Sequence, residues 1–284
     1  MHDAAAARKP NYGIDAPGVV RNLFLAGGAG LLLWTSVAAR FWSGVVWNFR
    51  VGPMGFGLAI GGLGMGTYML WSSRFGKVKE REELLDCVEW RGDETVLDVG
   101  CGRGLLLVGA AKRLTRGGKA FGIDIWQAQD LSGNRPEASL ENAQLEGVAD
   151  RVEVRTADMR RIPFPDGTFD RIVSSAAIHN LYAAPDRAEA LREIARVLKP
   201  GGQVVIFDVR HSHEYAANLK ANGLIDVERA GSAIESWVWG ILSLGRASFA
   251  TLRARKPAGA PAKADRIDEG NSMRNERERI PEPL

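Results

Sequence analysis

Two long uncharged stretches lie near the beginning of the chain. Residues 23–39 (LFLAGGAGLLLWTSVAA) and residues 51–71 (VGPMGFGLAIGGLGMGTYMLW) contain no charged side chain. The second is close to the ~20 residues that a helix needs to cross a bilayer. Aromatic side chains gather near the ends of both stretches, as they do at membrane–water interfaces. These are Trp34, Trp42, Trp47, Tyr68 and Trp71. The pattern predicts a transmembrane helical hairpin over residues 23–72.

The flanks of the two stretches indicate how such a hairpin would be oriented. Basic residues precede the first stretch and follow the second, and an excess of positive charge marks the cytoplasmic side of a membrane protein. Arg40 and Arg50, between the stretches, weaken this asymmetry. We therefore expect a multi-pass membrane protein in contact with membrane lipid, with both outer flanks in the cytoplasm. The flanking basic residues are Arg8, Lys9, Arg21, Arg74, Lys77, Lys79 and Arg81.

Glycine is frequent in both stretches and leaves two interpretations open. Gly57 with Gly61, and Gly62 with Gly66, have the spacing that lets membrane helices approach closely, which would also suit a homo-oligomer built through these helices. Glycine equally makes the stretches less hydrophobic than leucine-rich spans, so a helical hairpin buried in a soluble protein is the alternative. A cleaved signal peptide is disfavoured, because there are two such runs and the first begins beyond residue 20.

Short apolar runs alternate with helical periods from about residue 77 to residue 256. Such alternation predicts a parallel sheet covered by helices on both faces, the doubly wound α/β class. Two further strands, 224–230 and 247–256, follow without a proper helix between them, which predicts an antiparallel pair at one edge. The buried strands are expected at 95–99, 119–124, 151–156, 169–174 and 203–209, and the helices at 105–114, 137–146, 185–198 and 212–222.

These patterns divide the chain into four parts. A polar segment (1–22) precedes the hairpin (23–72), a single α/β domain follows (77–256), and a tail rich in charge, proline and small residues (257–284) is predicted to be disordered. The insert 234–245 (IESWVWGILSLG) is interpreted as a loop folded over the core or as an interfacial segment touching a membrane. Because the sheet pattern begins only near residue 95, removal of residues 1 to about 74 is expected to leave the domain folded and able to bind its ligand.

Composition removes several other classes of function. The 37 Lys and Arg residues nearly match the 34 Asp and Glu residues, giving a net charge of +3 and a pI of about 8.9. This balance is too mild to indicate binding of nucleic acid. The two cysteines, Cys87 and Cys101, have neither a paired spacing nor a nearby ligand cluster. Neither a disulfide framework nor a zinc site is therefore expected.

A glycine-rich loop lies between the first strand and the first helix of the domain. In VLDVGCGRG (96–104), Gly100, Gly102 and Gly104 permit a tight turn and the close approach of a ligand, at the edge of the sheet where such folds bind their ligands. The spacing is G-x-G-x-G, and Leu105 stands where a dinucleotide fingerprint would have its third glycine. Asp98, just before the loop, suits a ligand with positive charge.

Two more acids follow strands of the same sheet. Asp124 ends the second predicted strand, where a carboxylate can accept hydrogen bonds from both hydroxyls of a ribose. In ADM (157–159), Asp158 follows the third strand and can accept from an adenine amine, while Met159 packs on the ring. These features indicate an adenosine without phosphates that carries a charged amino-acid end.

The connection after Asp124 is unusually long. WQAQDLSGN (126–134) exceeds the few residues that usually join a strand to the next helix. Trp126 either covers the cofactor or packs on the neighbouring helix, and the sequence does not separate these two roles.

Four segments of the domain carry a family resemblance. VLDVGCGRG, GID, ADMRRIPFPDGTFD and EIARVLKPGGQVVIFDV resemble the class I S-adenosylmethionine-dependent methyltransferases, especially the subgroup that methylates small molecules such as quinone precursors and sterols. The resemblance covers about residues 80–256. It implies a Rossmann-like seven-stranded sheet whose last strand is antiparallel, with S-adenosyl-L-methionine as the cofactor.

The resemblance also implies roles for individual residues. Asp98 and the three glycines Gly100, Gly102 and Gly104 would hold the methionine end of the cofactor. Asp124 would bind the ribose, and Asp158 would bind the adenine. The remaining cofactor contacts that it implies are Ile125 and Met159, which would pack on the adenine, and Ser174.

Candidates for contact with the methyl acceptor follow the fourth and fifth strands. His179, in SSAAIHN (174–180), is either a general base or a structural residue that caps the next segment or contacts the cofactor. The structural role is the expected one, because similar family members place a histidine there irrespective of the acceptor. His211 and Tyr215, in DVRHSHEY (208–215), are candidates for substrate contact. No metal site is predicted, because His211, His213 and Glu214 would diverge on a strand-to-helix turn.

The resulting hypothesis is a membrane-anchored methyltransferase that acts on a small, lipophilic acceptor and not on nucleic acid. A base would be needed only if the acceptor arrives protonated. Two alternatives remain open. One is a methyltransferase for a small soluble acceptor such as a thiol, with the hairpin serving only location. The other is a cofactor-binding assembly protein without turnover.

Overall fold

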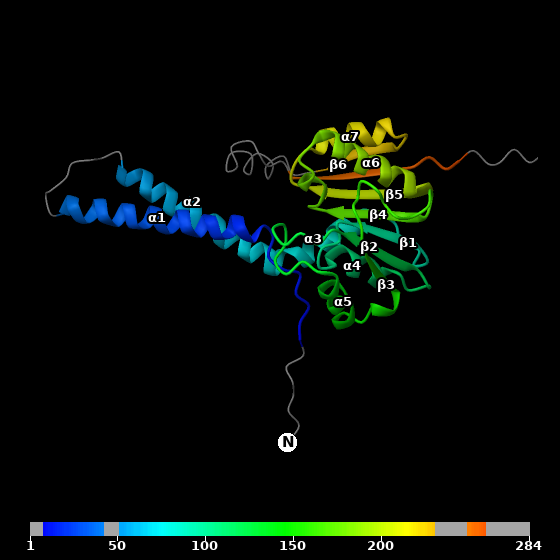
Figure 1. Ribbon diagram of the computed structural model, residues 1–284, viewed down its shortest axis with the longest axis horizontal. Coiled ribbons are helices and arrows are strands. Elements are labelled where there is room, and N and C mark those ends of the chain that lie inside the picture. Colours follow the sequence, from blue (N-terminus) through cyan, green and yellow to red (C-terminus); the bar gives the residue numbers. More distant parts are fainter. Residues whose placement is uncertain (1–7, 43–50, 231–248, 260–284) are drawn as a thin grey trace, which may run out of the picture.

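One seven-stranded sheet forms the centre of the α/β domain (Figure 1). The computed structural model describes residues 8–42, 51–230 and 249–259, and the strand order is β3-β2-β1-β4-β5-β7-β6. Strands β1 to β5 are parallel, whereas β7 is antiparallel to both of its neighbours, β5 and β6. The predicted Rossmann-like sheet with its last strand antiparallel is therefore confirmed. The strands are β1 (Thr95–Val99), β2 (Lys119–Asp124), β3 (Val152–Thr156), β4 (Phe169–Ser175), β5 (Leu198–Asp208), β6 (Ile225–Ala230) and β7 (Ala250–Arg255).

Alternate residues of the strands face two different layers of helices. In β1, Leu97 and Val99 belong to an apolar cluster with α6 and α7, whereas Val96 belongs to a second cluster with α3, α4 and part of α5. The sheet is thus covered on both faces, as the doubly wound class requires (Figure 1). The helices of the domain are α3 (Lys77–Leu85), α4 (Leu105–Arg113), α5 (Pro136–Leu145), α6 (Ala184–Val197) and α7 (Ser212–Ala221), with short 3₁₀ turns at Ala149–Arg151 and Ile178–Asn180.

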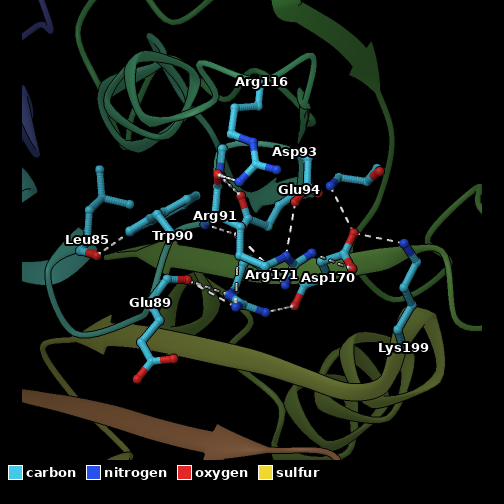
Figure 2. A network of polar contacts seen from close by, with 12 residues as sticks. Leu85, Glu89, Trp90, Arg91, Asp93, Glu94, Arg116, Asp170, Arg171 and Lys199 are labelled. Carbon is cyan, nitrogen blue, oxygen red and sulfur yellow. Dashed lines mark hydrogen bonds and ion pairs between the residues drawn. The ribbon is translucent and has the colours of Figure 1, made fainter.

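A polar network joins the start of β4 to the segment that precedes β1 (Figure 2). The buried Arg171 of β4 donates from Nε and Nη2 to the carbonyl oxygen of Glu89, at 3.1 and 3.0 Å. The buried Glu94 accepts from the backbone N–H groups of Arg91 and Gly92, at 2.5 and 2.8 Å. These bonds anchor the segment between α3 and β1. The strand that leads into the glycine-rich loop therefore starts from a fixed position.

Two apolar helices, α1 (Pro17–Trp42) and α2 (Val51–Trp71), pack along each other and extend away from the sheet (Figure 1). A π-helical turn, Ser72–Gly76, joins α2 to α3. Glycines make the contact between α1 and α2 close, since a Cβ on Gly62 would lie 2.6 Å from a backbone oxygen of α1. Of the predicted glycine pairs, Gly62 and Gly66 face α1, whereas a Cβ on Gly57 or Gly61 would meet no described atom within 4 Å.

The two helices differ as candidates for a membrane span. Among the described residues, only Pro17–Ala39 of α1 is long and apolar enough to cross a membrane, judged by length and composition. Glycine-rich α2 does not meet the same criterion. Two packed helices are present where the helical hairpin was predicted, and the first begins at residue 17 instead of residue 23. Two membrane spans were expected, and among the described residues only one helix qualifies as a candidate.

The polar residues before α1 are packed on the α/β domain. Tyr12 is buried and its hydroxyl donates to Glu146 at 2.6 Å. Asp15 forms an isolated antiparallel β-bridge with Leu131, and the buried Lys77 donates to the carbonyl oxygen of Tyr12 at 3.1 Å. These contacts speak against the expectation that the domain is indifferent to removal of residues 1–74. The insert at 234–245 and the predicted tail from residue 260 onward lie outside the described residues.

Candidate cofactor and active site

The glycine-rich loop turns between β1 and α4 through three left-handed glycines. Gly100, Gly102 and Gly104 have φ angles of 73°, 53° and 81°, a region that side chains disfavour. A Cβ on Gly100 would collide with the side chain of Ala177, and one on Gly102 would lie 2.9 Å from Leu131 Cδ2. The loop is thus closely approached by the segment after β4 and by the long connection after β2.

Asp98 is buried behind this loop and has no cationic partner among the described residues. Its Oδ2 accepts a hydrogen bond from the backbone N–H of Leu107, in the first turn of α4, at 2.8 Å. Burial raises the pKa of Asp98 to about 8 despite this bond, with a smaller contribution from the charge of Asp124. A ligand that brings positive charge would stabilise the ionised carboxylate. The site therefore fits the charged amino-acid end of S-adenosylmethionine.

Asp124 lies beside the loop at the end of β2. Its two oxygens accept from the backbone N–H groups of Gly102 and Trp126, at 2.9 and 2.6 Å. The Asn134 amide lies 3.4 Å from Asp124 Oδ1, while its own Oδ1 is buried without a partner among the described residues. Asp124 thus stands where a ribose was predicted, with a further unpaired acceptor next to it. Trp126 donates from Nε1 to Thr156 Oγ1 at 2.8 Å and packs against the α3/α4 cluster, which favours the packing role for this ring.

The residues predicted for the adenine lie at the end of β3 and after β2. Asp158 is held by Arg160, whose Nη2 lies 2.6 Å from Oδ2, and these hydrogen bonds lower the pKa of Asp158. An adenine amine would therefore share this carboxylate with a guanidinium. Ile125 is exposed, and Met159 is partly buried against the α6/α7 cluster.

Two residues predicted to touch ligands are buried. Ser174 donates its hydroxyl to the carbonyl oxygen of Val99 at 2.8 Å, which ties β4 to β1 just below the loop. Tyr215 is fully buried in the α6/α7 cluster, and its hydroxyl donates to Asp208 at 3.2 Å. Both hydroxyls already have protein partners, so cofactor contact by Ser174 and substrate contact by Tyr215 remain predictions.

His179 and Asp208 form a hydrogen-bonded pair after β4 and at the end of β5. His179 Nδ1 donates to Asp208 Oδ1 at 2.6 Å, and the backbone N–H of His179 donates to Oδ2 at 3.0 Å. Because a carboxylate only accepts, this pattern assigns the proton of the neutral imidazole to Nδ1 and leaves a lone pair on Nε2. Within the described part of the chain, Nε2 has no hydrogen-bond partner, and the side chain is 20% exposed.

Asp208 is buried at the centre of this arrangement. Besides the two bonds from His179, it accepts from the Tyr215 hydroxyl and from its neighbour's backbone N–H, that of Val209, at 2.7 Å. An imidazole that is oriented by a buried carboxylate, with its second nitrogen free, is suited to accept a proton from a substrate. The geometry suits a base, and the choice between this role and the structural role expected for His179 is left to experiment.

His211 immediately precedes α7, as its N-cap residue in the left-handed region, with φ at 61°. Its Nδ1 lies 3.5 Å from Glu214, which is itself paired with Arg187 at 2.8 Å. Burial and the charge of Arg187 lower the pKa of His211, so its neutral form prevails at neutral pH. Contact with an acceptor remains a prediction for this partly exposed side chain. In the stretches that the structure describes, no three His, Cys, Asp or Glu side chains gather as a metal site would need.

Two parts of this site were missed by reasoning from the sequence. Asp208 ends a parallel strand, as Asp124 does, so its place at the carboxyl edge was the available signal. Asn134 and the residues before α1 had no such signal. The one hint was the unusual length of the 126–134 connection, which ends at Asn134 and which the residues before α1 contact.

Comparison with known families assigns a class to this domain. Residues 97–206 match the family model described as a methyltransferase domain. The matched region runs from β1 through the glycine-rich loop, Asp124, Asp158 and His179 into β5. This part of the chain is similar to methyltransferase domains, which supports the predicted enzyme class.

Several curated proteins are similar to the same region. The chain is 35% identical over 128 residues to the methyltransferase GfsG of Streptomyces halstedii, covering 45% of this chain and 42% of that protein. It is 31% identical over 146 residues to a demethylmenaquinone methyltransferase of Lactiplantibacillus plantarum (51% and 54%), and 34% identical over 149 residues to the sterol 4-C-methyltransferase strm-1 of Caenorhabditis elegans (51% and 41%). The chain thus spans about half the length of these relatives.

Solved structures share the fold. The [4+2]-cyclase SpnF aligns with a TM-score of 0.51 and 22% identity, covering 64% of this chain and 82% of that one. A geranyl diphosphate C-methyltransferase from Streptomyces coelicolor A3(2) aligns with a TM-score of 0.50 and 19% identity, covering 63% and 78%. At these identities the likeness concerns the fold alone. One of the two is a cyclase by name, so the fold does not fix the activity.

Proposed function

We propose that the protein transfers a methyl group from S-adenosylmethionine to a small, lipophilic acceptor at a membrane surface. The observation that carries this proposal is the apolar surface of the α1–α2 hairpin. Large apolar side chains lie exposed along both helices, including Leu32 at 72% and Met54 at 69%. Exposed apolar side chains along a helix are stabilised by contact with lipid and destabilised by contact with water. We therefore treat α1, and α2 with it, as the membrane anchor.

The names of the similar proteins support the class of acceptor. One is a demethylmenaquinone methyltransferase and another is a sterol 4-C-methyltransferase, so two of these relatives are named for apolar ring compounds. An anchored domain would meet such a compound at the membrane surface, near the end of the hairpin that leads into α3. The basic residues that flank the two helices support a cytoplasmic position for the domain. Gly57 and Gly61, which do not face α1, support packing of a second copy there as a homo-oligomer.

The chain's own residues supply alignment and a proton acceptor. When bound, S-adenosylmethionine supplies a methyl on a sulfonium, whose charge disappears in transfer and therefore favours a dry site. Asp124 orients the ribose and Asp98 pairs with the amino end. His179 Nε2 accepts a proton from an acidic group of the acceptor, such as a hydroxyl, and Asp208 stabilises the resulting imidazolium.

Two experiments test the proposal. Membranes bearing the protein, a lipid extract and radiolabelled S-adenosylmethionine are incubated together, and the labelled product is identified by mass spectrometry. Label in an organic-soluble compound is expected, with Asp124→Ala as the inactive control. Label found only in water-soluble compounds would favour the thiol-type alternative. For the anchor, alkaline carbonate extraction should leave the full-length chain with the membrane, and its release would contradict the span.

A further inference from the structure

Six residues before α1 are hydrogen-bonded to the long connection after β2. We call residues 11–16 the N-terminal strap and residues 126–134 the β2 connection. The backbone N–H of Ile14 donates to Ser132 Oγ at 2.7 Å, and that of Ser132 donates to the Ile14 carbonyl oxygen at 3.0 Å. The Asp15–Leu131 bridge lies between these bonds, and the N–H of Ala16 donates to the Asp130 carbonyl oxygen at 2.9 Å. Two segments more than 100 residues apart in the chain thus form a short antiparallel ladder.

The β2 connection separates the strap from the cofactor residues. Leu131 lies against Gly102, so closely that a Cβ there would be 2.9 Å from its side chain. Gly102 in turn donates its N–H to Asp124 at 2.9 Å, and Asn134 reaches the same carboxylate. The β2 connection therefore lies between the strap and Asp124, the predicted ribose ligand.

Arg103, inside the glycine-rich loop, joins all three segments. Its Nε donates to the Asn11 carbonyl oxygen at 2.7 Å, and its Nη1 donates to the carbonyl oxygens of Ser132 and Gly133, at 3.2 and 3.3 Å. Asn142 of α5 completes the contact, because its Nδ2 donates to the carbonyl oxygens of both Asn11 and Arg103. No carboxylate among the described residues pairs with Arg103, so its guanidinium serves these carbonyl groups.

The strap is also fixed on the side that faces α3. Lys77 forms an ion pair with Asp15 at 2.7 Å and donates to the carbonyl oxygens of Tyr12 and Gly13. The Tyr12 hydroxyl lies between Glu146 and Arg81. The strap is therefore held by buried contacts, and it provides a firm support for the β2 connection.

We propose that Arg103 is a positioning residue for the cofactor, which holds the strap and the β2 connection against the glycine-rich loop. The strap is then part of the cofactor-binding wall. The physical reason is conformational entropy: a loop with three left-handed glycines has many alternative conformations, and fixing it beforehand lowers the cost of binding. The inference rests on the proposed binding of S-adenosylmethionine at Gly102 and Asp124.

The test measures the affinity of the full-length chain, in detergent micelles, for S-adenosylhomocysteine by calorimetry. Arg103→Met removes the donors but keeps an apolar side chain, and should raise the Kd about tenfold or more, since several bonds from a charged donor are lost. Arg103→Lys should recover part of the affinity. The matched control is Arg151→Met, because Arg151 also donates to a backbone carbonyl, that of Leu114 at 3.1 Å, away from the site. Its Kd should equal that of the wild type.

A second variant acts on the strap without altering the glycine-rich loop. Ser132→Ala removes the acceptor for the Ile14 N–H and should weaken binding about threefold or more, through one lost hydrogen bond. Hydrogen exchange in residues 126–134 should rise in both variants. Unchanged affinity in a folded Arg103→Met or Ser132→Ala protein overturns the inference. A wild-type chain without affinity would instead contradict the cofactor assignment itself, and the inference with it.

Discussion

Replacing His179 by alanine separates a catalytic role of the imidazole from a structural one. The ring supplies one of the hydrogen bonds to the buried Asp208, and the backbone N–H groups of residue 179 and Val209 and the Tyr215 hydroxyl would remain. Losing one bond to a charged group costs about 1.5–3 kcal/mol. In a domain of this size, that corresponds to a fall in Tm of roughly 5 °C or somewhat more. Asp208 keeps three donors, so the variant should fold.

The effect on turnover should be larger and of a different kind. Loss of a general base typically lowers kcat by about a hundredfold or more, or about 2.7 kcal/mol in activation free energy. The Kd for S-adenosylhomocysteine should stay within about twofold, because the residues assigned to the cofactor do not bond to this ring.

Single-turnover methyl transfer, calorimetry and thermal melts on the same preparations decide between the roles. His213→Ala, which removes an exposed histidine of α7, is the matched control and should leave all three measurements unchanged. The reasoning is refuted if kcat falls only in proportion to the folded fraction, or if the main loss is in cofactor affinity. Either result would return His179 to the structural role that the sequence had suggested.

Three further changes test other parts of the site and fold. Asp124→Ala should weaken S-adenosylhomocysteine binding about ten- to a hundredfold in calorimetry, since charge-assisted hydrogen bonds are lost. Burial raises the pKa of Asp98 to about 8, so the folded chain keeps a proton that the unfolded chain releases near pH 4. Stability should therefore fall as pH rises from about 4 to 8, by up to about 1.4 kcal/mol per unit from this group, and Asp98→Asn should flatten that slope in urea titrations. Arg171→Met should cost about 3 kcal/mol or more by the same method, because the buried guanidinium that holds the Glu89 carbonyl is lost, whereas the exposed Arg192→Met should barely change the midpoint.

The sheet and its glycine-rich loop could be predicted because their signals are local. The run at residues 95–99 is mostly apolar, as expected of a strand that is covered on both faces. The strand found there has the predicted bounds. The acids at strand ends follow from the same logic, since parallel strands present their carboxyl ends at one edge. That logic locates Asp98 and Asp124 without any knowledge of distant contacts.

The direction in which side chains point at this edge of the sheet, and the partners that they bond to, could not be predicted from the sequence. Ser174 and Tyr215 lie near the carboxyl edge of the sheet, as predicted. The Ser174 hydroxyl, however, bonds to the backbone of β1, and the Tyr215 hydroxyl bonds to Asp208. The pairing of His179 with Asp208 depends on two strands coming side by side, 29 residues apart in the chain. Residue types alone could not choose between such partners.

The strap could not be predicted for the same reason, and it makes the segment before α1 part of the α/β domain. Its bonds reach residues 118 and 131 positions away and are made largely by backbone groups, which leave no periodicity in the sequence. The two ends of the hairpin also meet, because the N–H of Asp15 donates to Ser73 Oγ at 3.2 Å and this hydroxyl lies 3.1 Å from Asp15 Oδ2. The hairpin thus leaves the domain and returns to it at neighbouring points. A soluble form made by removing residues 1–74 would therefore lose the strap along with the anchor. A form that joins residue 16 to residue 73 through a short glycine–serine linker would keep the strap. Comparing the two forms separates the contribution of the membrane helices from that of the strap.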